Sequence, residues 1–170
     1  MKTKQITQTA AFLAIGLALH AFTPSLLGSM KPDFLLSMLF LQLFHRPKLK
    51  EALVIALVFG IASAMTTGFP GGQVPNLIDK LVTTLFFITF LKLAKRLPRM
   101  LQLLLGSALG TLVSGTVFLI SAQLITQQSI LFGALFAGIV LPATAVNSFF
   151  VTLIGLALAH TPLRRTIFAE

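Results

Sequence analysis

The sequence has no cysteine, no tryptophan and no tyrosine, and only four acidic residues among 170. The lack of cysteine excludes disulfide bridges and thiolate metal sites, and the three histidines have no ligand-like spacing. No segment matches the P-loop pattern GxxxxGK[ST], the zinc-protease pattern HExxH or the serine-hydrolase pattern GxSxG. We therefore predict a protein that is not an enzyme, has no metal or cofactor, and lacks a P-loop for ATP.

Charged residues are also scarce, at 10%, whereas hydrophobic residues make up 56% of the chain. A soluble domain of this size cannot bury so much apolar surface, so the partner of this surface is predicted to be the lipid bilayer. The net charge of +9 does not indicate nucleic-acid binding, because the basic residues lie in short clusters between apolar runs. The sequence predicts an all-α polytopic membrane protein with a single domain, residues 1–170.

Proline, glycine and charged residues divide the chain into apolar runs that predict six transmembrane helices. Their predicted ranges are 6–28, 33–45, 51–67, 77–95, 100–125 and 131–159. The second run is short, about 15 residues or ~22 Å of helix, so we expect it to be tilted, kinked or shielded by its neighbours. An alternative with five spans would omit this run.

The distribution of lysine and arginine favours six spans with both termini in the cytoplasm, as in an inner-membrane protein. With this topology the inner side holds eleven basic residues: Lys2, Lys4, Arg46, Lys48, Lys50, Lys92, Lys95, Arg96, Arg99, Arg164 and Arg165. The outer side holds only Lys31 and Lys80. Cytoplasmic loops carry such an excess of positive charge. A five-span topology without the second run would place the basic cluster from Arg46 to Lys50 on the wrong side of the membrane and remove this asymmetry.

Small residues four positions apart recur in several of the predicted helices. Such rows let helix backbones approach closely in lipid. We expect packing inside the chain for the rows of the third and fifth helices, which are Ala52, Ala56, Gly60 and Ala64, and Gly106, Gly110 and Ser114. For Ala10, Ala14 and Ala18 in the first helix, internal packing and contact with a partner protein are both open. The hydrophobic interiors of the predicted spans lack the buried Asp and Glu relays that are expected of a proton-driven pump.

Polar candidates gather in the predicted outer loops. The segment 66–80 contains three glycines, two prolines and several hydrogen-bonding side chains, and irregular backbone at this depth is tolerated only beside protein or a watery cavity. A binding loop is one interpretation. In the other, Asn76 caps the fourth helix, Asp79 completes a capping box, and the glycines form a turn. Both can hold, because a helix amino terminus also binds carboxylates.

The predicted ligand site combines these loops with the sixth helix. Asp33 lies in the first turn of the second predicted helix, after Pro32, and can also complement the dipole of that helix. Asn147 needs a partner within the membrane, either another helix or a ligand. His20 and Gln123 are interpreted as interhelical or interfacial groups. The candidate binding residues are Lys31, Asp33, Phe69, Gly71, Gly72, Gln73, Asn76, Asp79, Lys80 and Asn147. For a zwitterionic amino acid, we predict that Asp79 or Asp33 binds the ammonium. Lys80, Gln73 or the amides of the glycine loop are predicted to bind the carboxylate.

Two motifs, Met30-Lys31-Pro32-Asp33 and the segment from Phe69 to Asn76 continuing to Asp79-Lys80, resemble the TrpP-like tryptophan transporters. This family is related to the substrate-binding S components of energy-coupling factor (ECF) transporters. The resemblance implies a six-helix S-component fold, an outward-facing pocket for tryptophan, and coupling to a T subunit and two ATPases. It also implies contact between the T subunit and the row formed by Ala10, Ala14 and Ala18.

Two other classes of function remain open. A secondary transporter would take up its substrate with an ion gradient and without a partner protein. A membrane scaffold would bind no small ligand.

Overall fold

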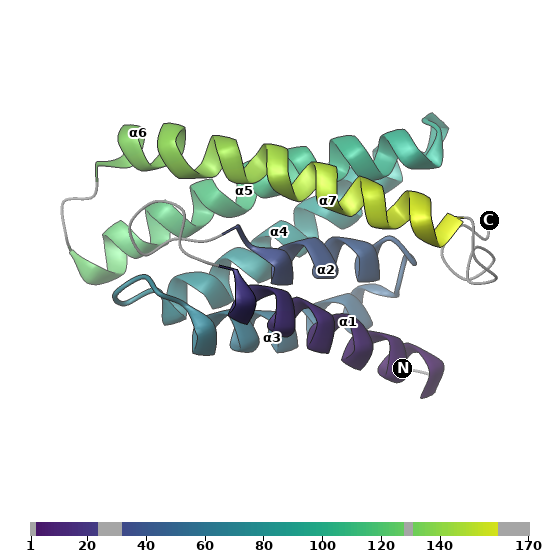
Figure 1. Ribbon diagram of the computed structural model, residues 1–170, viewed down its shortest axis with the longest axis horizontal. Coiled ribbons are helices and arrows are strands. Elements are labelled where there is room, and N and C mark those ends of the chain that lie inside the picture. The colour runs from purple at the N-terminus through teal and green to yellow at the C-terminus, as the bar shows by residue number, and fades with distance from the viewer. Residues whose placement is uncertain (1–2, 24–31, 128–130, 160–170) are drawn as a thin grey trace.

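The structure is a computed structural model that describes residues 3–23, 32–127 and 131–159. Its helices are α1 (Thr3–Phe22), α2 (Phe34–Leu43), α3 (Leu49–Thr66), α4 (Gln73–Leu93), α5 (Arg99–Thr126), α6 (Phe132–Leu135) and α7 (Leu141–Ala159). A short 3₁₀ turn, Ala94–Arg96, follows α4, and a π-helical turn, Phe136–Val140, joins α6 to α7 in one continuous helix. The described residues contain no strand, which confirms the predicted all-α class (Figure 1).

The observed helices differ from the predicted ranges mainly at their ends. α1 ends at Phe22, and residues 24–28 of the predicted first span lie outside the described residues. α4 begins at Gln73 instead of 77, because Gly72 is its N-cap. Four stretches are long and apolar enough to cross a membrane, namely Gln5–Phe22, Leu49–Thr66, Arg99–Thr126 and Phe132–Ala159, and α2 is a shorter apolar helix.

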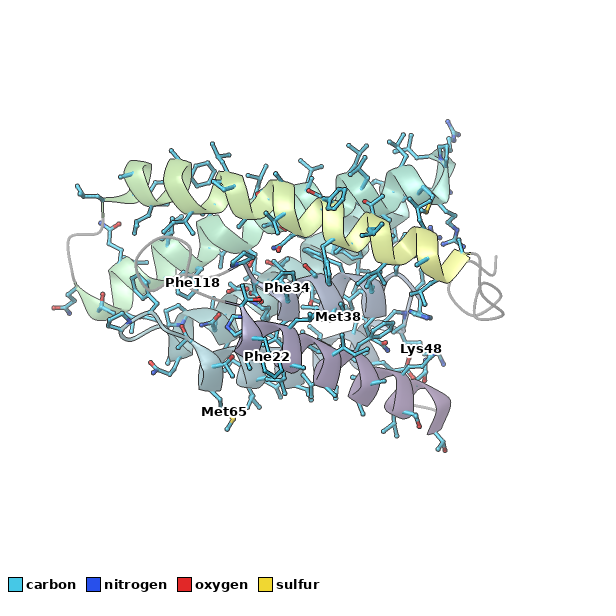
Figure 2. All side chains as sticks on the ribbon, viewed as in Figure 1. Phe22, Phe34, Met38, Lys48, Met65 and Phe118 are labelled. Carbon is cyan, nitrogen blue, oxygen red and sulfur yellow. The ribbon has the colours of Figure 1, made fainter. Side chains whose placement is uncertain are left out.

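The helices run alternately up and down, so that the chain connections gather at two ends of the bundle (Figure 1). The start of α1, the end of α7 and the connections α2–α3 and α4–α5 lie at one end, and Lys48 marks this end in Figure 2. This basic end carries Arg46, Lys48, Lys50, Lys92, Lys95, Arg96 and Arg99. Lys2, Arg164 and Arg165 lie outside the described residues. By the positive-inside rule, the basic end faces the cytoplasm.

α2 is shielded by its neighbours, which explains how ten residues of helix fit inside a membrane protein. Its residues from Leu35 to Leu43 are all buried. Phe40 stacks on Phe87 of α4 with ring centroids 4.8 Å apart, and its ring also covers Gly110 of α5. A Cβ atom at Gly110 would lie 2.6 Å from Phe40 Cζ, so only glycine allows this close approach.

The rows of small residues divide into two kinds. Most of those in α3 and α5 are buried, as expected for packing inside the chain; the buried ones are Ala52, Ala56, Gly60, Gly106, Gly110 and Ser114. In α1 the opposite holds, because Ala10, Ala14 and Ala18 are all exposed. α1 instead packs on α2 through Gly16, where a Cβ atom would come within 3.0 Å of Leu35. Of the two alternatives for the row in α1, packing inside the chain is therefore wrong.

Candidate functional site

A cavity of about 110 Å³ lies between the helices, and its lining includes residues 67–69 of the α3–α4 connection. This connection lies at the end of the bundle opposite the basic end (Figure 1). One water molecule needs on the order of 10–15 Å³ of such volume, so the cavity has room for several waters or a small organic group. The lining residues come from six helices (α1 to α5 and α7), the π-helical turn and the α3–α4 loop: His20, Asp33, Leu36, Ser63, Thr67, Gly68, Phe69, Asn76, Asp79, Thr111, Ser114, Gly115, Phe118, Ile139, Val140, Ala143 and Asn147.

One wall of the cavity is built on an ion cluster centred on Lys80. The Lys80 ammonium donates to Asp33 Oδ2 at 2.7 Å and to Asp79 Oδ1 at 3.0 Å. Ser114 Oγ donates a further hydrogen bond to Asp79 Oδ1, at 3.0 Å. The Lys80 side chain is fully buried, so it remains charged there at low cost only because both carboxylates accept from it.

Local structure places Asp33 at this wall. Asp33 is the N-cap of α2, and its Oδ1 accepts from the backbone N–H of Leu36 at 2.9 Å. Its other oxygen, Oδ2, accepts from the Lys80 ammonium at 2.7 Å. Asp33 therefore joins the start of α2 to the ion cluster.

The second polar feature of the cavity is a set of buried groups that lack partners. Asn147 on α7 has no exposed surface, yet neither its amide oxygen nor its amide nitrogen has a hydrogen-bond partner. Ser63 Oγ on α3 is also buried and without a partner. Buried polar groups are normally paired, because an unpaired one costs on the order of 1–3 kcal/mol. Since both residues line the cavity, their natural partner is a molecule inside it.

The remaining wall is apolar. Phe69 from the α3–α4 loop and Phe118 of α5 meet edge to face, with ring centroids 5.4 Å apart. The π-helical turn brings Ile139 and Val140 into the lining. Val140 packs so closely on Gly115 that a Cβ atom there would lie 2.5 Å from Val140 Cγ1. The cavity therefore has a charged and polar side and an aromatic and aliphatic side.

Five of the predicted site residues line this cavity: Asp33, Phe69, Asn76, Asp79 and Asn147. Lys80 does not line it, because its ammonium is directed at the two carboxylates. Gly71 and Gln73 are exposed, and Gly72 is buried as the N-cap of α4. Lys31 lies outside the described residues.

Two sequence predictions about this region are wrong. Asn76 does not cap α4, because it lies inside the helix and its Nδ2 donates to the carbonyl oxygen of Gly72 at 2.8 Å. Asp79 forms no capping box, since it accepts from Lys80 and Ser114 instead. The sequence also predicted no buried Asp or Glu relay inside the spans; Asp79 of α4 is nevertheless buried, and it shares Lys80 with Asp33.

Sequence reasoning missed most of the neutral lining. Ser63 and Thr67 lie four positions apart, as do Ser114 and Phe118, so each pair shares a helical face or its extension. This four-residue spacing is the feature of the sequence that could have indicated the lining. It is a weak indication, because small polar residues in apolar helices more often bond to their own backbone. His20, which was predicted to be an interhelical or interfacial group, also lines the cavity; Gln123 is exposed.

A bundle of apolar, membrane-spanning helices around a cavity with one polar and one aromatic side is the architecture of a polytopic membrane protein that binds a small molecule. Residues 2–164 match the family described as "Tryptophan transporter TrpP". The chain belongs to this family of tryptophan transporters, and it is a multi-pass protein of the bacterial plasma membrane.

Three curated relatives carry the name "Probable tryptophan transport protein". The relative from Bacillus subtilis is 43% identical over 170 residues, which cover 100% of this chain and 98% of the relative. The relative from Clostridium acetobutylicum is 39% identical over 171 residues, with 100% and 99% covered. The relative from Clostridium perfringens is 41% identical over 166 residues, with 92% and 89% covered. No solved structure matches the chain.

Proposed function

We propose that this chain captures tryptophan from outside the cell and works as the substrate-binding S component of an ECF transporter. The observation that supports this proposal most directly is the two-sided cavity on the side away from the basic end. A tryptophan molecule has the same two sides, an apolar indole ring and a zwitterionic backbone. The relatives named as tryptophan transport proteins support the same ligand.

In this proposal the indole ring contacts Phe69 and Phe118, and the ligand ammonium binds Asp79 and Asp33. Burying an aromatic side chain of 150–250 Å² yields roughly 4–6 kcal/mol at ~25 cal/mol per Å². Asn147 supplies a further hydrogen bond from its unpartnered amide. In this proposal Lys80 does not bind the ligand carboxylate, which was the role predicted for it from the sequence. Instead it holds the carboxylates of Asp33 and Asp79 in place.

The exposed face of α1 supports coupling to a partner protein. Ala10, Ala14 and Ala18 present small side chains on one exposed face, and another membrane helix can approach it closely. The sequence has no P-loop, so ATP-driven uptake would need separate ATPases together with a T subunit. We propose that the T subunit contacts this face.

Tryptophan binding can be measured on the purified chain in detergent. Because the chain contains no tryptophan or tyrosine, the indole fluorescence of the ligand is seen without a protein background. Binding should shift this emission as the ring enters the apolar side of the cavity. Reconstituted uptake should then require the T subunit, the ATPases and ATP. A purified, folded chain that leaves the emission unchanged at millimolar tryptophan would contradict the proposed ligand.

A second function is favoured by the buried Asp33–Lys80–Asp79 cluster. Ionisable groups inside a membrane bundle often form ion or proton pathways, so an ion-coupled secondary transporter of tryptophan is the alternative mechanism. Uptake into liposomes by the chain alone, driven by an ion gradient and without ATP, would establish this alternative and exclude the S-component role.

A further inference from the structure

The charges around the cavity are unequal. Asp33 and Asp79 both line it, whereas no lysine or arginine among the described residues does. The ammonium of Lys80 lies behind them and offsets only one of the two negative charges. Two carboxylates against one ammonium leave a formal net charge of −1 at the cavity wall, with the lining residue His20 counted as neutral. A buried site of this charge favours a cation over a neutral or anionic ligand.

The unpartnered groups of the cavity point to a ligand independently of this charge. Asn147 is fully buried with both amide atoms unpaired, and Ser63 Oγ is buried and unpaired. A ligand ammonium has three N–H donors and accepts nothing. The cavity offers acceptors of both kinds for such a group, namely carboxylate oxygens and the neutral oxygens of Asn147 and Ser63.

We propose that the site selects its ligand by the ammonium group, and that the ligand carboxylate is dispensable. The ligand class is therefore an indole ethylamine, with or without a carboxylate. A decarboxylated ligand such as tryptamine brings one positive charge and neutralises the wall. Zwitterionic tryptophan brings no net charge and leaves the wall at −1, so repulsion of its carboxylate by the wall offsets the one hydrogen bond that the unpaired Nδ2 of Asn147 can donate to it. This inference rests on the proposed function and specifies which part of the ligand the site recognises.

The test compares three indole ligands on the purified chain by their own fluorescence. Tryptophan carries both charged groups, tryptamine carries only the ammonium, and indole-3-propionate carries only the carboxylate. We expect tryptamine to bind at least as tightly as tryptophan. Indole-3-propionate should bind about ten- to a hundredfold more weakly than tryptophan, as expected when a charged hydrogen bond is lost.

Two variants locate the effect at the cavity. Asp79→Asn raises the wall charge from −1 to zero, so it should weaken tryptamine binding about tenfold or more and reduce the preference for tryptamine over tryptophan. Glu51→Gln is the matched control, because Glu51 lies in the first turn of α3 at the basic end. It removes the same charge away from the cavity and should change neither affinity.

Each outcome of the wild-type series is decisive, even if Asp79→Asn does not fold. If tryptophan binds and tryptamine fails to compete, the ligand carboxylate is required and the inference is wrong, while the proposed function stands. Equal binding of indole-3-propionate and tryptophan would also refute it. Binding of tryptamine without tryptophan would support the inference and refute tryptophan as the substrate. Binding of none of the three refutes both.

Discussion

Replacing Lys80 by methionine tests whether the ion cluster holds the cavity wall together. Methionine keeps an unbranched side chain of similar length but removes the ammonium. The structure gives Lys80 two carboxylate partners, Asp33 at 2.7 Å and Asp79 at 3.0 Å, and no exposure to solvent. In Lys80→Met these carboxylates face each other without the cation between them. The variant should therefore be much less stable than a typical surface substitution.

The magnitude follows from the burial of the cluster. Removing one partner of a buried ion pair costs about 3–5 kcal/mol, because it leaves an uncompensated charge. For a chain of 150–250 residues, 1 kcal/mol corresponds to about 2–4 °C in Tm, so the expected decrease is roughly 6–20 °C. Removing Asp79 as well, in Lys80→Met/Asp79→Asn, leaves only Asp33, whose side chain is 25% exposed. The double variant should recover at least ~2 kcal/mol.

The assay is thermal unfolding in one detergent, followed by the helical circular dichroism signal. Lys92→Met is the matched control, because Lys92 is an exposed lysine in the last turn of the same helix, and its Tm should stay within about 2 °C of the wild type. A Tm of Lys80→Met within that margin would refute the reasoning. So would a double variant whose loss equals the sum of the two single losses, since coupled partners are not additive.

Three further predictions concern packing, coupling and topology. Gly110→Ala places a Cβ atom 2.6 Å from the Phe40 ring and should cost on the order of 1–3 kcal/mol, seen as a lower Tm; an unchanged Tm would contradict the close packing. Ala14→Leu should abolish ATP-driven uptake with unchanged tryptophan affinity, whereas an equal loss of affinity would contradict a partner contact. An impermeant thiol reagent should label Gln73→Cys but not Lys48→Cys in intact cells; the opposite pattern would invert the topology.

The fold could be predicted from the sequence because apolar runs, prolines and basic clusters each carry a direct physical meaning in a membrane. Even the short helix α2 could be predicted, as the apolar run between Pro32 and Pro47. The end of α1 and the start of α4 could not be placed, since residues beside a helix end can continue it or leave it at little cost. Gly72 became the N-cap of α4, and Asn76 therefore lies within the helix.

The site was predictable where a residue type is costly in a membrane. Asp33, Asp79 and Asn147 are such residues, and all three line the cavity. The role of Lys80 was not predictable, because a sequence does not show that an α2 residue far away in the chain supplies its second carboxylate. Ser63 was missed for the opposite reason, since a serine in an apolar helix is common and its environment decides whether it is used.

The shortness of α2 has a consequence for the path of a transported molecule. Ten residues of helix span about 15 Å, roughly half of a ~30 Å hydrocarbon core, and Asp33 lies at the end of α2 away from the basic loops. In Figure 2 the neighbouring Phe34 lies near the middle of the bundle. In the proposed function, a ligand bound at Asp33 therefore lies about 15 Å from the other end of α2, and α2 is part of the barrier that remains between this ligand and the cytoplasm.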